Sequence, residues 1–165
     1  MLEIPEPLMS DISDGRCLPF IGAGFSLNAK LPAELKMPDW NGLANQLVED
    51  AVRFFHGERY DLRAWVVMPN HVHALFKVDA TPMAQILESW KKHSAQKANR
   101  LLKRRGEFWQ ADYWDTYMRD RGHERKTVRY IESNPAQAKL VLDPNEWLWS
   151  SARFRDEFSV LNLPS

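Results

Sequence analysis

An α+β domain is the fold class that the sequence predicts, and three observations point to it. Residues 60–78 alternate between opposite faces on both sides of Pro69-Asn70, which indicates a β-hairpin. Residues 40–55 and 81–103 carry apolar side chains every three or four positions, the spacing of amphipathic helices. Residues 113–119 form a further strand candidate. The 165 residues are enough for one domain, or for one domain and a fragment.

The two longer helices have recognisable boundaries. Gly57 is a stop for the helix over residues 40–55. Thr81 can cap the helix over residues 81–103, and Pro82 suits its first position because proline has no N–H to leave unpaired there.

A third helix is expected over residues 123–133. Pro135 disfavours helical geometry at Asn134, so the sequence predicts a kink or a boundary at that point. One more helical turn is expected over residues 136–141, followed by a tail that packs across the domain as a cover.

Composition narrows the class of protein. Hydrophobic residues make up 44% of the chain and charged residues 27%, as in ordinary globular proteins. Cys17 is the only cysteine, which excludes a disulfide framework and a cysteine-rich zinc site. Residues 1–10 do not resemble a signal peptide, and no apolar run reaches the length of a membrane span, so a cytoplasmic location without a membrane partner is expected. The net charge is zero, but residues 1–48 are acidic and the remainder is mildly basic.

His71 and His73 are the most distinctive local feature. Residues two apart on a strand project from the same face, so both imidazoles should lie together while Val72 turns into the core. Two neighbouring imidazoles are half of a site for a divalent metal, and a third ligand must come from elsewhere. Taken alone, the pair can equally be polar surface on an exposed strand.

Tyr130 and Asn134 are the candidates that complete this site. They are four residues apart and share a helix face if the helix reaches Asn134. Tyr130 lies about 100° around the helix from the apolar Ile131, so its phenol should stay accessible. The alternatives are an aromatic at the edge of the core and an asparagine that caps the helix before Pro135.

A basic run over residues 91–105 contains seven Lys or Arg and no acid. Its members are Lys91, Lys92, Lys97, Arg100, Lys103, Arg104 and Arg105. They could bind DNA phosphates or simply form a solvated helix face. His93, Trp109, Tyr113 and Trp114 are nearby residues that could stack on unpaired bases or pack in the core.

Four blocks, at residues 65–73, 108–115, 130–135 and 138–141, resemble the REP-associated tyrosine transposases of the single-tyrosine HUH transposase superfamily. The combination of Met-Pro-Asn-His-Val-His with Tyr-Ile-x-x-Asn-Pro is specific, and the blocks occur in the family order across residues 53–155.

This resemblance implies a ferredoxin-like antiparallel sheet with helices packed on one face. It implies that His71, His73 and Asn134 hold Mg²⁺ or Mn²⁺ and that Tyr130 is the nucleophile. The implied activity is cleavage of single-stranded DNA next to a hairpin, through a 5′-phosphotyrosine and a free 3′-OH. A free phenol has a pKa of about 10 and is a poor nucleophile unaided, so a metal that polarises the scissile phosphate fits this chemistry.

The beginning of the chain departs from this family, whose first strand is missing or replaced. We expect a loose arm over residues 1–15, a fragment over residues 16–48 that resembles the opening of a sirtuin-like domain, and the transposase-like domain over residues 49–165. In the fragment, Gly22-Ala-Gly-Phe-Ser26 is expected to form a turn that could approach a nucleotide phosphate. Residues 17–21 could replace the first strand, although Pro19 suits an edge strand better than a central one.

Three functions therefore compete: an active transposase, an inactive remnant that binds hairpin DNA, and a nucleotide-binding fragment of a sirtuin-like protein. Whether the chain is a monomer or a homodimer is left open by the sequence.

Overall fold

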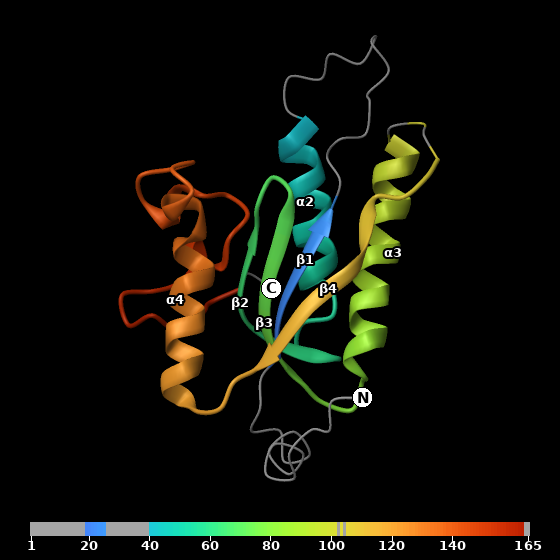
Figure 1. Cartoon of the computed structure of the whole chain (residues 1–165). Coiled ribbons are helices and arrows are strands. Elements are labelled where there is room, and N and C mark those ends of the chain that lie inside the picture. Colours follow the sequence, from blue (N-terminus) through green and yellow to red (C-terminus); the bar gives the residue numbers. More distant parts are fainter. Residues whose placement is uncertain (1–18, 26–39, 102, 104, 164–165) are drawn as a thin grey trace.

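Four strands form one antiparallel sheet in the computed structural model, which describes residues 19–25, 40–101, 103 and 105–163. The strands are β1 (Pro19–Phe25), β2 (Tyr60–Val67), β3 (His71–Val78) and β4 (Trp109–Tyr117), in the order β2-β3-β1-β4 (Figure 1). The hairpin expected over residues 60–78 is confirmed. Its turn is closed by the Met68 N–H, which donates to the His71 carbonyl oxygen at 2.8 Å. The sequence predicts a strand at residues 113–119. The observed β4 begins four residues before the expected start and ends two residues before the expected end.

Strand β1 occupies the place of a first strand in the middle of the sheet, between β3 and β4. The expectation that Pro19 would make it a poor central strand is wrong. Pro19 is the first residue of β1 and pairs with Tyr117, whereas the pairing with β3 begins at Phe20. A proline at the first residue of a strand is tolerated because the ladder hardly needs its missing N–H there.

The glycine turn expected at residues 22–26 is also wrong, because residues 22–25 continue β1. The expected junction between residues 48 and 49 falls inside helix α2 (Trp40–Arg53). The loose arm expected over residues 1–15 lies outside the described residues.

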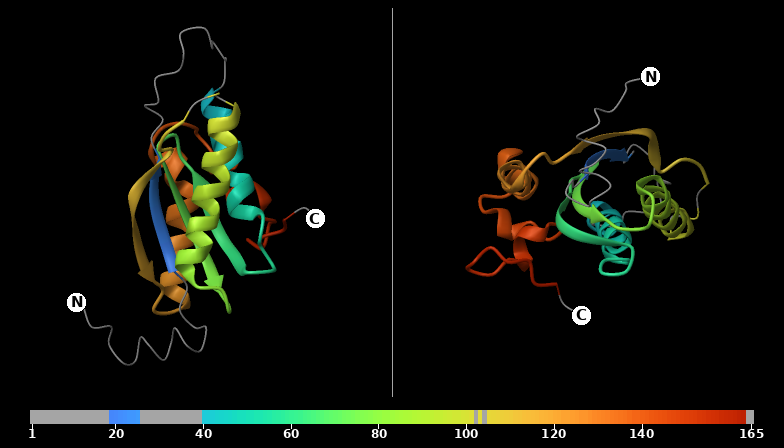
Figure 2. Two further views of the ribbon diagram at one scale, coloured as in Figure 1. Left: turned by 90° about the vertical axis from the view of Figure 1, so that its right-hand side faces the viewer. Right: turned by 90° about the horizontal axis from the view of Figure 1, so that it is seen from below.

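Helices cover both faces of the sheet, which corrects the expectation of helices on one face. Helices α2 and α3 (Met83–Leu101) pack on one face, against side chains such as Trp65 and Val67. Helix α4 (Arg121–Gln137) packs on the other face (Figure 2). There Ile131 shares a core cluster with Ala64 and Val66. The physical reason is that β2 is apolar on both faces, so each face needs a cover.

Helix α4 runs through the predicted boundary at Asn134 and Pro135. Asp120 caps its start by accepting a hydrogen bond from the His123 N–H at 2.8 Å. Beyond the proline the ladder resumes, because the Asn134 carbonyl oxygen accepts from the Ala138 N–H at 2.9 Å. Pro135 is buried in the last turn, where losing one ladder bond disturbs few later residues.

The C-terminal segment covers the outer edge of the sheet, as expected of the tail. It contains the short 3₁₀ helices η1 (Pro144–Glu146) and η2 (Ser151–Phe154). The Val67 N–H donates to the Trp149 carbonyl oxygen at 2.8 Å, and the Trp147 indole donates to the Val67 carbonyl oxygen at 2.9 Å. These bonds satisfy backbone groups that an edge strand would otherwise expose. Within the described ranges, no helix is long and apolar enough to cross a membrane.

Candidate active site

The imidazoles of His71 and His73 lie side by side on the face of the sheet that carries α4. Their ring centroids are 4.7 Å apart, with the rings nearly perpendicular, and both residues are half-buried. The strand period of two explains the shared face, since Val72 between them is buried in the opposite core. Leu75, two residues beyond His73, belongs to the core under α4.

Both histidines are held in the neutral form at neutral pH. Burial lowers the pKa of His71, and burial together with the neighbouring His71 lowers the pKa of His73 to about 4. The Nδ1 atom of His71 lies 2.7 Å from the Asn70 side-chain oxygen. Because that oxygen only accepts, Nδ1 carries the hydrogen and Nε2 carries the lone pair. A neutral imidazole oriented by a hydrogen bond at its other nitrogen is the form that binds a metal.

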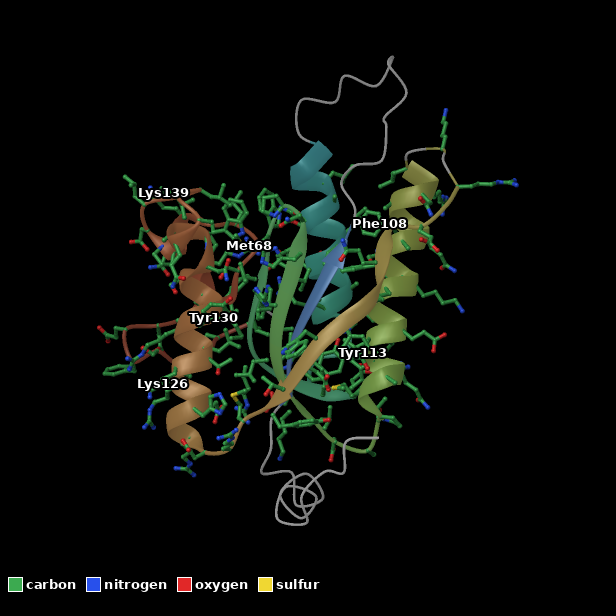
Figure 3. All side chains as sticks on the ribbon, in the orientation of Figure 1. Met68, Phe108, Tyr113, Lys126, Tyr130 and Lys139 are labelled. Carbon is green, nitrogen blue, oxygen red and sulfur yellow. The ribbon has the colours of Figure 1, made fainter. Side chains whose placement is uncertain are left out.

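Tyr130 belongs to α4 (labelled in Figure 3), and its ring contacts that of His73. Its ring centroid is 5.6 Å from that of His73, and 45% of the residue is exposed. The next residue, Ile131, is completely buried against the sheet. The helix therefore anchors itself through Ile131 and leaves the phenol at the edge of the contact, next to an imidazole and open to solvent.

Asn134 follows Tyr130 by one helical turn on the same side of α4 and is half-buried. Among the described residues, no three His, Cys, Asp or Glu side chains are grouped so that they could hold a metal ion. Besides the two histidines, the side-chain amide of Asn134 is the candidate ligand that α4 carries one turn after Tyr130. An amide oxygen is a donor that suits Mg²⁺ and Mn²⁺, whereas imidazole nitrogens are the softer donors of the set and suit transition metals better than Mg²⁺.

Two glycines of β1 lie opposite the two histidines. Gly22 pairs with His73 and Gly24 pairs with His71 in the ladder between β1 and β3. Residues directly opposite each other in an antiparallel pair project from the same face, so β1 presents only backbone beside both imidazoles. The role of these glycines could not be recognised from the sequence, where they suggested a turn. The one usable signal was their spacing of two, which matches that of the histidines.

The basic run does not lie on the face that carries the histidines. Most of it belongs to α3, which packs on the opposite face of the sheet. Lys91 is engaged at the β4 edge: its ammonium donates to the Gln110 carbonyl oxygen at 2.9 Å and lies 5.7 Å from the centre of the Tyr113 ring. Arg104 lies outside the described residues.

A second basic surface was not singled out from the sequence, although its spacing of four was visible. Arg121, Arg125 and Arg129 are exposed on α4, one helical turn apart. They line a groove of about 450 Å³ together with Phe158 and Ser159 of the C-terminal segment. Two acids also line this groove, and one of them, Glu132, is paired with Arg155 at 2.7 Å.

Comparisons with known proteins identify the family. A sequence model described as "Transposase IS200 like" matches residues 41–134, which is more than half of the chain. The chain therefore belongs to the IS200-like transposase family. The comparison with curated proteins finds no match.

Two of the solved structures that match this chain are transposases. One is a REP-associated tyrosine transposase bound to a REP hairpin, with a TM-score of 0.67 and 18% sequence identity over 90% of this chain and 85% of that one. The other is described as a transposase from Deinococcus radiodurans R1, with a TM-score of 0.43 and 16% identity over 70% of this chain and 88% of that one. The expected sirtuin-like beginning finds no support in these comparisons, and residues 19–25 belong to the same sheet as the histidines.

Proposed function

We propose that this chain is a DNA-cleaving tyrosine transposase that uses Tyr130 as its nucleophile. The observation that carries the proposal is the contact between Tyr130 and His73, whose ring centroids are 5.6 Å apart, beside His71. The packing of α4 on the sheet does not depend on this contact between Tyr130 and His73, because the neighbouring Ile131 already anchors the helix. An accessible phenol can act as a covalent nucleophile when a neighbouring base or a bound metal activates it, and the two imidazoles are the groups that could provide this activation.

The reaction is an exchange of one phosphate ester for another. The phenolic oxygen of Tyr130 attacks the scissile phosphorus, a bond forms between these atoms, and the bond from phosphorus to the 3′ oxygen breaks. The phenol loses its proton and the departing 3′ oxygen gains one, so the products are a 5′-phosphotyrosine and a free 3′-OH. No bond energy from another molecule is needed, because the phosphate ester persists in the covalent intermediate and strand joining can reverse the step.

A divalent cation would be held by His71, His73 and Asn134. When bound, Mg²⁺ or Mn²⁺ supplies Lewis-acid stabilisation of the charge that develops on the phosphate oxygens. The residues fit this ion because both imidazoles are neutral at pH 7 and the Nε2 lone pair of His71 is set by its bond to Asn70.

The substrate we propose is single-stranded DNA next to a hairpin. The argument is the resemblance in fold to a transposase whose solved structure contains a REP hairpin. The register of β1 supports it as well, since glycine lies opposite both histidines and adds no side chain beside them. The alternative of an inactive remnant rested on a missing first strand. Because β1 fills that place in the sheet, this reason for inactivity no longer applies.

The test is formation of a covalent protein–DNA adduct in the presence and absence of metal. With Mn²⁺ and a labelled hairpin that carries single-stranded flanks, the intact chain should form an adduct that survives denaturing electrophoresis. Removal of the metal with EDTA, or His71→Ala, should abolish the adduct while hairpin binding persists, because only stabilisation of the reacting phosphate is removed.

A histidine on the other side of the sheet provides the control. His93 belongs to α3, where its ring stacks on Phe54 at 5.8 Å, so the metal dependence of adduct formation should be the same in His93→Ala as in the intact chain. An adduct that forms equally well in EDTA would exclude the metal role. Binding without any adduct from the intact chain would favour the inactive remnant.

We further propose that the basic run over residues 91–105 binds the phosphates of the hairpin. Glutamine at Lys97, Arg100 and Arg104 should make the salt dependence of DNA affinity shallower. The slope of log K against log salt should change by roughly 0.7–0.9 for each phosphate that is no longer neutralised. The measurement is fluorescence anisotropy at several salt concentrations.

The arginine row of α4 is the matched comparison for this run. Glutamine at Arg121, Arg125 and Arg129 removes the same number of charges from the helix that carries Tyr130. If only this second variant flattens the slope, the phosphates are bound at α4 and the run on α3 is a solvated face.

A further inference from the structure

One row of residues crosses the sheet from the candidate active site to its far edge. Gly22 of β1 pairs with His73 on one side and with Trp114 of β4 on the other. Directly opposite residues project from the same face, so the Trp114 indole leaves the sheet on the side of His73. Since neighbouring strands are about 4.8 Å apart, the two residues are separated by roughly 10 Å along the row.

Strand β1 contributes no side chain between His73 and Trp114, because the residue between them is glycine. Gly22 lies within this row, and Gly24 is its counterpart opposite His71. Helix α4 packs on β2 and β3, and Figure 1 shows β4 along the other edge of the sheet. The histidines therefore have Tyr130 on one side. On the other side, the backbone of β1 at Gly22 and Gly24, here named the glycine floor, leads toward Trp114.

Trp114 is 76% exposed although it lies in the middle of strand β4 and is paired with Gly22. Neighbouring aromatic residues are engaged elsewhere. Tyr113 projects from the opposite face, where Lys91 lies over its ring, and the Trp109 indole donates to the Ser94 hydroxyl at 2.9 Å. Aromatic side chains normally bury about 150–250 Å² of surface, so this exposed indole offers a flat apolar surface to a partner on the side of the histidines.

We propose that Trp114 is a stacking platform for an unpaired base of the DNA strand that enters the active site. The inference rests on the proposed function, and it assigns to that site a residue that holds the single-stranded flank. A base has a flat π-face that an indole can cover, and such stacking tolerates any base sequence. The glycine floor leaves room for the sugar and phosphate between Trp114 and the histidines.

The experiment compares a DNA hairpin with a single-stranded flank, the same hairpin with an abasic flank, and the blunt hairpin. Affinities are measured by fluorescence anisotropy in EDTA, so that no cleavage intervenes. Trp114→Ala should weaken binding of the normal flank roughly tenfold or more and leave the blunt hairpin unaffected. The abasic flank should bind the intact chain as weakly as the normal flank binds the variant. Trp114→Phe should recover part of the affinity, because phenylalanine keeps an aromatic face.

Leu142→Ala is the matched control, since Leu142 is an apolar side chain that is 97% exposed but belongs to the segment after α4. It should bind all three DNAs like the intact chain. The platform is excluded if Trp114→Ala binds the normal flank as tightly as the intact chain, or if it weakens binding of the abasic flank by the same factor. A change in self-association without a change in DNA affinity would likewise overturn it and assign the indole to a second copy of the chain. If the intact chain binds none of the hairpins, the proposed function itself fails.

Discussion

Tyr130→Phe is expected to eliminate the covalent protein–DNA adduct while folding and hairpin binding persist. The substitution removes only the hydroxyl, and Tyr130 contributes little to the core because 45% of it is exposed and Ile131 carries the packing. Phenylalanine keeps the ring beside His73 but has no oxygen to attack phosphorus. We expect the rate of adduct formation to fall by a factor of at least about 10³, as for other removed nucleophiles.

The measurement is denaturing electrophoresis of a labelled hairpin incubated with Mn²⁺, alongside anisotropy for binding. Tyr113→Phe is the matched control because Tyr113 is also an exposed phenol, at 39%, but projects from the opposite face of the sheet. It should form the adduct at the rate of the intact chain. An adduct that persists in Tyr130→Phe and disappears in Tyr113→Phe would move the nucleophile to β4 and invalidate the proposed active site.

Arg153→Ala should be the most destabilising substitution of a charged residue in the part of the chain described. Glu49 of α2 is completely buried, and both of its carboxylate oxygens accept from the Arg153 guanidinium at 2.9 Å. The Trp65 indole donates to the same carboxylate at 3.1 Å. Burial raises the pKa of Glu49, while Arg153 opposes that rise. Removing the arginine leaves a buried carboxylate without its counterion, which typically costs about 3 kcal/mol or more.

The pH dependence of this variant distinguishes the removed charge pairing from the removed packing. Without Arg153 the pKa of folded Glu49 rises further above its unfolded value, so the unfolding free energy should fall as pH increases from about 4.5 toward 8. Urea unfolding at several pH values measures this. Adding Glu49→Gln to the variant should restore part of the stability, since the amide is uncharged and still accepts from Trp65. A double variant as unstable as Arg153→Ala would show that packing against Phe154, and not charge, accounts for the effect.

The parts of the fold that depend on neighbouring residues could be predicted from the sequence. The hairpin around Pro69-Asn70, the shared face of His71 and His73, and the accessible side of α4 at Tyr130 all follow from strand or helix periodicity. The start of α3 after Pro82 follows from local backbone chemistry. In each case the competing conformations differ within a few residues, and the pattern of side chains distinguishes them.

The helix across Pro135 shows where local reasoning fails. Proline disfavours helical geometry at the residue before it, but that preference is small compared with the packing of a whole helix. Pro135 is buried and Ile131 anchors the preceding turn, so tertiary contacts keep Asn134 helical. The placement of α4 on its own face of the sheet likewise depends on β2 being apolar on both sides.

By itself the sequence determined the motifs that resemble REP-associated tyrosine transposases, the two histidines on one strand and the tyrosine on a helix, because each is written within a few consecutive residues. Only the tertiary structure decided that β1 lies in the centre of the sheet and that Gly22 lies between His73 and Trp114. It also decided the pairing of Glu49 with Arg153. These choices join segments tens of residues apart, and their energy comes from burial and charge pairing across the fold, which no local period encodes.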